Sequence, residues 1–309
     1  MNYKKLIRSR ALRIKILSLL NWIPDSIMIP LQYRIHTGRR LNLKNPQRFT
    51  EKLQLYKLKY RNPLMLRCTD KYEVRSVVEE MGLADILIPL IGVYDSAEAI
   101  DFESLPLQFV AKTTDGGGGN QVFICRDKRE LDKNEFFSKV NEWFKAPKAK
   151  NAGREWAYEN GYPRRVVIEQ LISDGKRKDI PDYKFFCFDG VPAYCQVIGS
   201  RTTGETIDFY DMEWNHMEFR GLNAACNNAV QRMPEPDNFV GMKKLACELS
   251  AGYPFVRVDL YNTGDNIYFG ELTFYPASGF GHFTPDCWDE KIGALMKIPE
   301  TSLEKSGGG

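Results

Sequence analysis

Four residues with reactive or charged side chains stand at alternating positions near the C-terminal end of the chain: Arg257, Asp259, Glu271 and Thr273. Residues 254–261, PFVRVDLY, alternate apolar and charged side chains as a half-buried strand does, and 267–274, IYFGELTF, read as a second strand. The Gly, Asn and Asp residues of 262–266 predict a tight turn between them. The sequence therefore predicts a hairpin that gathers the charged side chains on one face.

Asp259 and Glu271 are the candidate metal ligands of this hairpin. If the strands pair symmetrically about Gly264, Asp259 faces Phe269, Arg257 faces Glu271, and the two carboxylates are diagonal neighbours roughly 6–8 Å apart. Carboxylates at that distance repel each other unless a cation lies between them, and hard oxygen ligands suit Mg²⁺. A cross-strand ion pair between Arg257 and Glu271 explains the same pattern, and the hairpin alone leaves both interpretations open.

A glycine-rich turn follows a predicted strand that carries Lys112 at its end, FVAK at 109–112, and a second strand begins at Gln121. Glycine lets backbone N–H groups approach and enclose phosphate oxygens, and a lysine adds a positive charge beside them. The pattern is not a Walker A motif, because no GK[ST] opens a helix. A phosphate-binding turn and an ordinary surface loop both fit.

Residues 168–172, IEQLI, are predicted to form an apolar strand. At its edge an acidic residue, Glu169, is followed by the apolar residues Leu171 and Ile172. This suits adenine, whose exocyclic amine needs an acceptor and whose ring needs apolar walls. The alternative is a core strand that ends in solvent.

The elements that must position these motifs alternate between helix and short strand. Helical patterns cover 46–82, 132–145 and part of 234–252, whereas strand patterns cover 86–93, 121–125, 166–172, 183–188 and 192–198, the last two joined at Asp189-Gly190. No repeats interrupt this order, which predicts an α+β protein.

Composition excludes several classes of protein. A formal charge of +3 and a pI of about 8.3 are too mild for a nucleic-acid partner. The seven cysteines are scattered without a CxxC pair, which argues against zinc or a disulfide framework and for a reducing cytosol. No apolar run approaches the ~20 residues of a spanning helix. We therefore expect a cytoplasmic protein.

The N-terminal residues 1–23 mix six Lys and Arg residues with many Leu and Ile residues. One interpretation is a helix packed on the protein's own surface. The other is a peripheral contact with an anionic membrane at the inner face of the cell. At the opposite end, residues 297–309 predict a disordered tail.

The order of the motifs resembles the ATP-grasp superfamily. A TDK lysine (Lys71) precedes a strand lysine and glycine-rich turn, an EQLI edge, DYKFFCFDG, RVD and GELTF. Within the superfamily, five longer segments resemble the teichuronopeptide-biosynthesis, or TupA-like, branch, and the similarity spans about residues 30–295. The segments are NPQRFTEKLQLYKLKYRNP, CTDKYEVR, DYKFFCFDGVP, RVDLY and FGELTFYPASGF.

The resemblance implies a helical N-terminal region with a pre-grasp segment at 1–105, followed by two α+β lobes, 106–175 and 176–296, that clamp ATP. It further implies that Lys71 and Lys112 bind the phosphates of ATP, and that the turn covers them through Gly116, Gly117, Gly118 and Gly119. The adenine ring is then held by Glu169, Gln170, Leu171 and Ile172. Asp182 takes the ribose hydroxyls, and Lys184 is a further candidate contact to the phosphates.

For the metal and the chemistry, the resemblance implies that Asp259 and Glu271 hold Mg²⁺ while Arg257 and Lys112 offset the charge that builds during phosphoryl transfer. Superfamily members usually carry Asn two residues after the metal-binding Glu, whereas this chain has Thr273, whose hydroxyl is a weaker ligand. Arg201 in GSRTTG is a further catalytic candidate, as a bidentate clamp for a substrate carboxylate. A solvated arginine is the alternative there.

The implied reaction is ATP-dependent carboxylate–amine ligation through an acyl phosphate, and the branch implies an amino acid joined to a uronic-acid-type sugar in surface polysaccharide or capsule biosynthesis. No enzyme nucleophile is needed, which fits the lack of a Ser–His or Cys–His signature. Three alternatives stay open: an ATP-dependent glycan phosphotransferase, a sugar-nucleotide glycosyltransferase, and a non-catalytic binding module.

Overall fold

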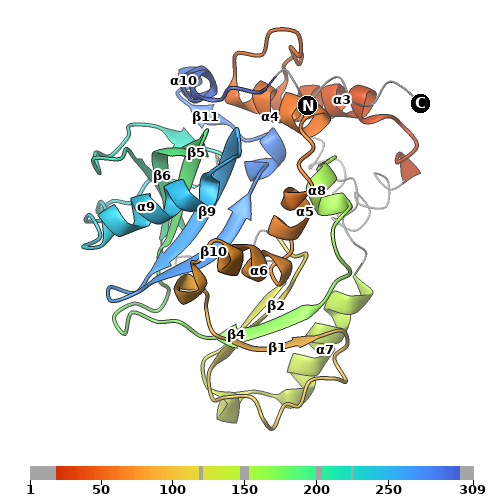
Figure 1. The fold of residues 1–309 in the computed structure, drawn as a ribbon, viewed down its shortest axis with the longest axis vertical. Coiled ribbons are helices and arrows are strands. Elements are labelled where there is room, and N and C mark those ends of the chain that lie inside the picture. Colours follow the sequence, from red (N-terminus) through yellow and green to blue (C-terminus); the bar gives the residue numbers. More distant parts are fainter. Residues whose placement is uncertain (1–18, 118–120, 147–152, 200–203, 224–225, 300–309) are drawn as a thin grey trace.

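Two antiparallel sheets carry the fold in the computed structural model, which describes residues 19–117, 121–146, 153–199, 204–223 and 226–299 (Figure 1). The smaller sheet has the strand order β1-β4-β2-β3. Its strands are β1 (Leu90–Tyr94), β2 (Phe109–Thr113), β3 (Val122–Cys125) and β4 (Val166–Gln170). Helix α7 (Lys133–Lys145) packs on this sheet because its apolar stripe, Phe136, Val140 and Trp143, is buried against Phe109, Ala111 and Ile168.

The larger sheet has the order β10-β9-β5-β6-β7. Its strands are β5 (Asp182–Phe188), β6 (Val191–Gly199), β7 (Thr206–Tyr210), β9 (Phe255–Asn262) and β10 (Ile267–Thr273). Helix α9 (Phe239–Ser250) covers one face, where Phe239 stacks on Phe185. Strands β8 (Arg220–Gly221) and β11 (Phe283–Thr284) form a separate short pair. All residues of β5 are buried, since both faces of this sheet are covered.

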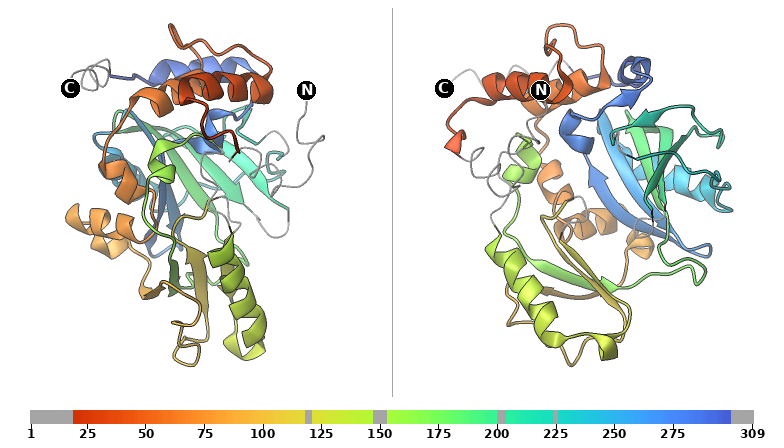
Figure 2. Two further views of the ribbon diagram at one scale, coloured as in Figure 1. Left: turned by 90° about the vertical axis from the view of Figure 1, so that its right-hand side faces the viewer. Right: turned by 180° about the vertical axis from the view of Figure 1, so that it is seen from behind.

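The remaining helices come mostly from the N-terminal region. They are α3 (Asp25–Thr37), α4 (Phe49–Lys59), α5 (Leu64–Cys68), α6 (Glu73–Glu80), α8 (Trp156–Glu159) and α10 (Cys287–Leu295), with short 3₁₀ turns η1 (Ala84–Ile86), η2 (Lys128–Glu130) and η3 (Pro276–Gly279). Figure 2 shows α3, α4 and α10 at the end of the molecule away from the smaller sheet, and α5 and α6 between the sheets. Among the described residues, no helix combines the length and hydrophobicity needed to cross a bilayer.

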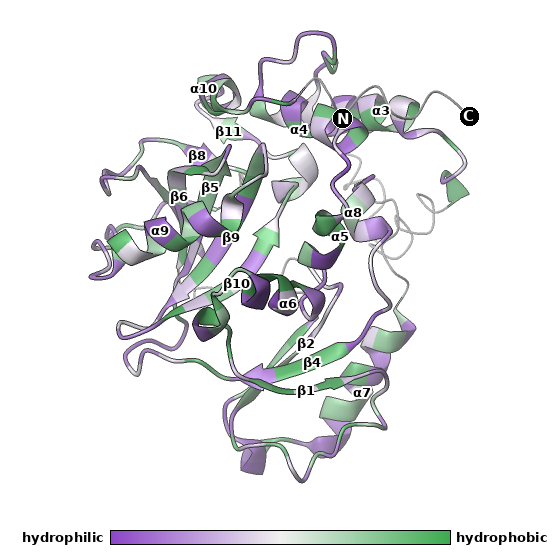
Figure 3. Ribbon diagram, viewed as in Figure 1, coloured by the Kyte–Doolittle hydropathy of each residue, from purple (hydrophilic) through white to green (hydrophobic). Residues whose placement is uncertain are grey.

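Helix α4 covers the second face of the larger sheet. The Phe49 ring contacts the rings of Phe186, Phe188 and Phe255 with centroid distances of 5.0–6.2 Å. Because side chains alternate along a strand, Phe186 and Lys184 of β5 point to this same face. Helices α4, α5 and α6 therefore contribute to the core of the larger lobe. Figure 3 shows both hydrophobic and hydrophilic residues along α4.

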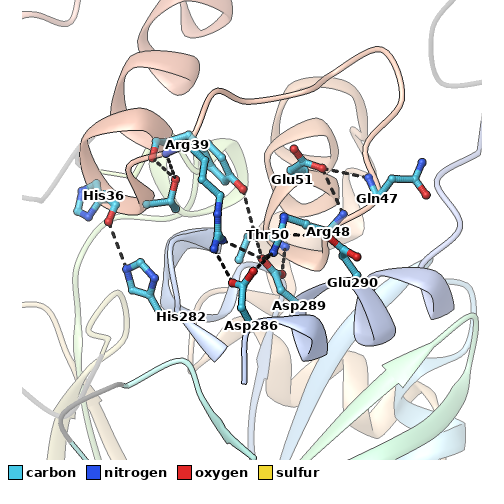
Figure 4. A network of polar contacts seen from close by, with 12 residues as sticks. His36, Arg39, Gln47, Arg48, Thr50, Glu51, His282, Asp286, Asp289 and Glu290 are labelled. Carbon is cyan, nitrogen blue, oxygen red and sulfur yellow. Dashed lines mark hydrogen bonds and ion pairs between the residues drawn. The ribbon is translucent and has the colours of Figure 1, made fainter. Parts of the chain in front are cut away.

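A polar network fixes α10 to the start of α4 (Figure 4). Buried Asp289 accepts hydrogen bonds from the Thr50 backbone N–H at 2.9 Å and its hydroxyl at 2.8 Å. Arg48 reaches Asp286 at 2.9 Å and Glu290 at 2.8 Å. The network closes the larger lobe with charge-assisted bonds that join residues far apart in the sequence.

The elements agree with the sequence predictions in type, and their bounds differ by a few residues. The helical stretch predicted over 46–82 is three helices, α4, α5 and α6. Strand β1 lies within the predicted N-terminal region 1–105 but pairs with β4, so residues before the predicted boundary at 106 belong to the smaller lobe. Of the predicted tail, residues 300–309 lie outside the described residues.

Candidate nucleotide and metal site

The β9–β10 hairpin places Glu271 directly opposite Asp259 and Thr273 directly opposite Arg257. The symmetric register expected from the sequence, with Arg257 opposite Glu271, is therefore wrong. Two shifts explain the difference: beside the turn Ile267 pairs with Asn262 instead of Tyr261, and a bulge at Gly270 then shifts the pairing again between Phe269 and Glu271. A Cβ atom at Gly270 would lie 2.9 Å from the Asp259 carbonyl oxygen, so glycine permits this close approach of the strands.

Arg257 is the centre of a hydrogen-bonded group on this hairpin. Its Nε and Nη2 contact the two carboxylate oxygens of Asp259 at 2.6 and 2.7 Å. Nη2 also donates to Glu271 Oε1 at 3.0 Å and to Thr273 Oγ1 at 2.9 Å, and the Thr273 hydroxyl donates to Glu271 Oε1 at 3.0 Å. The ion pair between Arg257 and Glu271 is thus present, and the two carboxylates share one guanidinium.

Lys184 completes the charge balance from the neighbouring strand. It lies opposite Asp259 in the β5–β9 register, and its ammonium group bonds to Asp259 Oδ2. The carboxylate of Asp182, two residues earlier on the same face, is 3.8 Å away. Asp259 therefore accepts from two cations and is 3% exposed, whereas the side chain of Glu271 is 38% exposed.

Glu271 lies in a strongly positive environment. Burial alone raises the pKa of this carboxyl, but the charges of Lys71, Arg257 and Lys184 and the bond from Thr273 lower the pKa to about 2. Glu271 is consequently ionised at neutral pH. Its oxygens remain available as hard anionic ligands.

Lys71 links this hairpin to the glycine-rich turn. Its backbone N–H donates to the Thr114 carbonyl at 3.0 Å, and its ammonium group donates to the Gly116 carbonyl. Burial lowers the pKa of Lys71, and Glu271 and Lys112 are among the charged groups that act on it. Thus Lys71, just before α6, lies where the turn of the smaller lobe meets the acidic residues of the larger lobe.

Glu169, predicted to accept from adenine, is paired instead with two cations in the structure. Lys112 Nζ is 2.6 Å from Oε2 and Arg75 Nη1 is 3.3 Å from Oε1. Sequence reasoning missed Arg75, which lies on α6 four residues after Lys71.

The other predicted adenine residues, Gln170, Leu171 and Ile172, line a cavity of about 320 Å³ with Thr263, Asp265, Asn266 and Tyr268 of the β9–β10 turn. The cavity lies where the connection between the lobes passes the hairpin tip. The Glu169 carboxylate does not line this cavity but points to the Lys112 side of β4, so the structure divides the four predicted residues between two environments.

Three predicted site residues, Gly118, Gly119 and Arg201, lie outside the described residues. Gly116 and Gly117 are described, and Gly116 contributes the carbonyl that accepts from Lys71. A Cβ atom at Gly116 would meet the Thr113 hydroxyl at 2.5 Å, so the first glycine of the run is needed for packing within its own turn.

A left-handed turn follows β10 directly. Ala277, Ser278 and Gly279 have φ values of 50°, 53° and 64°, an arrangement that costs energy for residues with a Cβ atom. Two buried side chains of α4 hold it: Gln54 Nε2 donates to the Gly279 carbonyl and Lys57 Nζ to the Ser278 carbonyl, both at 2.7 Å. Sequence reasoning missed Gln54 and Lys57, whose α-helical spacing of three was the available signal.

The oxygen atoms that the hairpin offers as ligands fit a magnesium ion. Asp259 and Glu271 offer carboxylate oxygens and Thr273 a hydroxyl oxygen, which are the hard ligands that Mg²⁺ prefers. Among the described residues, no three His, Cys, Asp or Glu side chains are grouped so that they could hold a metal ion by themselves. A metal at this place would therefore rely on these two carboxylates, on Thr273 and on oxygens of the nucleotide.

The family model for TupA-like ATP-grasp proteins matches residues 51–297. The chain belongs to this family. The match confirms the resemblance read from the motifs, including the predicted ATP-grasp fold with two α+β lobes. By family, the chain is an ATP-grasp enzyme.

The solved structures found by structural comparison are distant from this chain in sequence. D-alanine–D-alanine ligase from Helicobacter pylori is 12% identical, with 81% of this chain and 69% of that chain covered and a TM-score of 0.41. The corresponding ligase from Bacillus anthracis is 20% identical, with 77% and 69% covered and a TM-score of 0.44. N5-carboxyaminoimidazole synthetase from Staphylococcus aureus, complexed with ADP, is 15% identical, with 81% and 59% covered and a TM-score of 0.44. None of the curated proteins compared matches the chain.

Proposed function

We propose that this TupA-like ATP-grasp protein is an ADP-forming carboxylate–amine ligase. The observation that carries the proposal is the meeting of three cations, Lys71, Lys184 and Arg257, with Asp259 and Glu271 at the junction of the two lobes. Such an arrangement of alternating charge suits a triphosphate, whose oxygens need cations, and a divalent metal ion, which needs carboxylates.

In the proposed reaction the substrate carboxylate oxygen attacks the γ-phosphorus of ATP and ADP leaves. The substrate amine then attacks the carbonyl carbon of the acyl phosphate, phosphate leaves, and the nitrogen loses a proton as the amide forms. Phosphoryl transfer places charge on the equatorial oxygens, and cations held in position lower the barrier because they need no reorganisation. We assign this role to Lys71, Lys112 and Arg257. Lys184 is assigned as a further contact to the phosphates.

Binding of ATP requires the cations to exchange partners. Lys112 would leave or share Glu169, and Lys184 would leave or share Asp259. Mg²⁺, when bound through Asp259, Glu271 and Thr273, would neutralise phosphate charge. The remaining roles follow the sequence prediction: Gly116, Gly117, Gly118 and Gly119 cover the phosphates, Gln170, Leu171 and Ile172 hold adenine, Asp182 binds ribose, and Arg201 binds the substrate carboxylate.

The substrates in this proposal are a uronic-acid-type sugar, which supplies the carboxylate, and an amino acid, which supplies the amine, in surface polysaccharide biosynthesis in the cytoplasm. The support is the resemblance to the teichuronopeptide branch. We also propose that the N-terminal region, including residues 1–23, meets the inner face of the membrane.

An assay of ADP and phosphate release across uronic acids and amines tests the ligase directly, followed by mass spectrometry of the product. Phosphate that appears only with both partners, together with a new amide, is the expected result. ADP without free phosphate would instead indicate a glycan phosphotransferase. Release of a nucleoside diphosphate from a sugar nucleotide would indicate a glycosyltransferase, and absence of turnover with Mg²⁺ and ATP a binding module.

A further inference from the structure

Helix α3 carries apolar side chains on two opposite sides. On one side, Met28, Ile29 and Tyr33 are buried, and the Tyr33 hydroxyl bonds to Thr50 of α4. On the opposite side a second apolar stripe is exposed to solvent at spacings of four residues: Ile27 at 60%, Leu31 at 49% and Ile35 at 42%. Figure 3 shows hydrophobic residues on this helix at the edge of the molecule. A helix that is apolar on both sides is normally covered on both sides.

The residues just before α3 are also exposed and apolar, with Leu19 at 69% and Trp22 at 79%. Their backbone is fixed by buried Arg154, which donates to the carbonyls of Leu20 and Ile23 at 2.9 and 2.8 Å. Leu19 and Trp22 are thus held outward. Together, Leu19, Trp22, Ile27, Leu31 and Ile35 are called the α3 surface below.

The charge of the chain is divided unevenly, and this indicates what covers the α3 surface. Nine of the 43 Lys and Arg residues but only one of the 40 Asp and Glu residues lie within residues 1–40, so this segment has a formal charge of +8 and the rest of the chain −5. Arg34 is exposed and lies beside Ile27 around the helix, since it follows Ile27 by seven residues, and Arg40 is exposed just beyond the helix. Apolar and basic groups therefore occur together.

We propose that the α3 surface docks on an anionic membrane. Aliphatic side chains and a tryptophan suit the boundary between headgroups and acyl chains, while Arg34 and the basic N-terminal residues suit anionic headgroups. A second copy of the chain is a poorer occupant, because a symmetric contact through this surface brings two segments of charge +8 together.

Docking would also orient the candidate site. The His36 ring, at the end of α3, stacks on Phe280 with a centroid distance of 4.4 Å, and Phe280 follows the left-handed turn at Ala277–Gly279. Figures 1 and 2 show α3 at the end of the molecule away from the smaller sheet. The turn next to the candidate metal hairpin would therefore face the bilayer side, and the smaller lobe would face away from it.

Co-sedimentation of the full chain with phosphatidylcholine vesicles, with and without about 30% phosphatidylglycerol, tests the proposal. The key variant carries Ile27→Gln, Leu31→Gln and Ile35→Gln. Its matched control is Val240→Gln, which changes a residue that is 73% exposed on α9 of the same lobe. We expect binding only to anionic vesicles, weaker at high salt, reduced at least about tenfold in the triple variant and unchanged in the control.

Quenching of tryptophan fluorescence by brominated lipid, compared between the parent chain and Trp22→Phe, places Trp22 at the bilayer if the proposal holds. Failure of the parent chain to bind anionic vesicles would overturn the proposal, as would equal binding of the triple variant, which would assign binding to the basic residues alone. A parent dimer that the triple variant converts to monomer would assign the surface to a second copy. Nucleotide binding by each variant separates this result from the ligase proposal.

Discussion

Lys112 of β2 and Glu169 of β4 are diagonal neighbours in the smaller sheet, with 2.6 Å between Nζ and Oε2. The lysine predicted to bind phosphate and the glutamate predicted to bind adenine thus form an ion pair with each other. Arg75 supplies a second cation to the same carboxylate at 3.3 Å. If Lys112 binds phosphate as proposed, ATP would have to compete with Glu169 for its ammonium group.

Lys112→Ala is expected to weaken binding of a non-hydrolysable ATP analogue by roughly ten- to hundred-fold, or about 1.5–3 kcal/mol, because a charge-assisted bond to phosphate is lost. Isothermal titration calorimetry measures the change, with Lys133→Ala on the exposed side of α7 as the control. The variant also removes one of the two cations paired with Glu169, so the free energy of unfolding is measured as well. The double variant with Glu169→Gln should recover stability without recovering affinity, and an affinity equal to that of the parent would refute the assignment.

Glu271→Gln is expected to abolish Mg²⁺-dependent turnover and to leave the fold intact. The amide keeps the shape and can still accept from Arg257 and Thr273, but it loses the negative charge that a magnesium ion needs. Turnover and thermal unfolding are compared with Glu213→Gln, an exposed site distant in sequence from the hairpin. Turnover close to the parent rate would show that Glu271 holds no catalytic metal.

The buried Lys57 should make stability depend on alkaline pH. Burial lowers its pKa to about 8, below its ordinary value near 10.4 in the unfolded chain. Between these values the unfolded chain binds more protons, so stability gains a contribution as pH rises from 8 to 10.5. Relative to Lys57→Met, the parent should gain on the order of 2–3 kcal/mol across this range in urea unfolding.

Lys59→Met, an exposed position on the same helix, serves as the control for Lys57→Met and should follow the pH dependence of the parent. Lys57→Met should leave nucleotide affinity close to that of the parent, because Lys57 holds the turn at Ser278 rather than a residue of the proposed ATP site. A pH dependence that is identical in parent and Lys57→Met would contradict the buried charge.

Gly270→Ala should disturb the candidate metal hairpin without adding or removing a charge. Its Cβ atom would lie 2.9 Å from the Asp259 carbonyl oxygen, which is backbone and cannot move aside cheaply. We expect a loss of about 1–3 kcal/mol in stability and a fall in turnover larger than that of Gly264→Ala at the hairpin tip. Unfolding curves and kcat measured for both variants check this, and a fully active Gly270→Ala would show that the bulge does not position Asp259 and Glu271.

The sequence predicted the elements well where local pattern decides them. Alternation in VRVDLY and the Asp189-Gly190 turn identified the central strands, and apolar spacing identified α7, because such patterns depend only on neighbours along the chain. The register of β9 and β10 was missed, since the pairing beside the turn and the bulge at Gly270 both depend on how two backbones meet. Arg75, Gln54 and Lys57 were also missed, because their partners lie 94 to 225 residues away along the chain.

What the sequence by itself determined is the order of the motifs, and with it the TupA-like ATP-grasp family and the identity of the charged residues that could serve ATP and a metal ion. Only the tertiary structure decided which charges meet. It pairs Lys112 with Glu169 and Lys184 with Asp259, and it brings Lys71 to Glu271 across the two lobes. The physical reason is that the type of an element follows from local periodicity, whereas ion pairs between elements depend on strand register and on how the lobes pack.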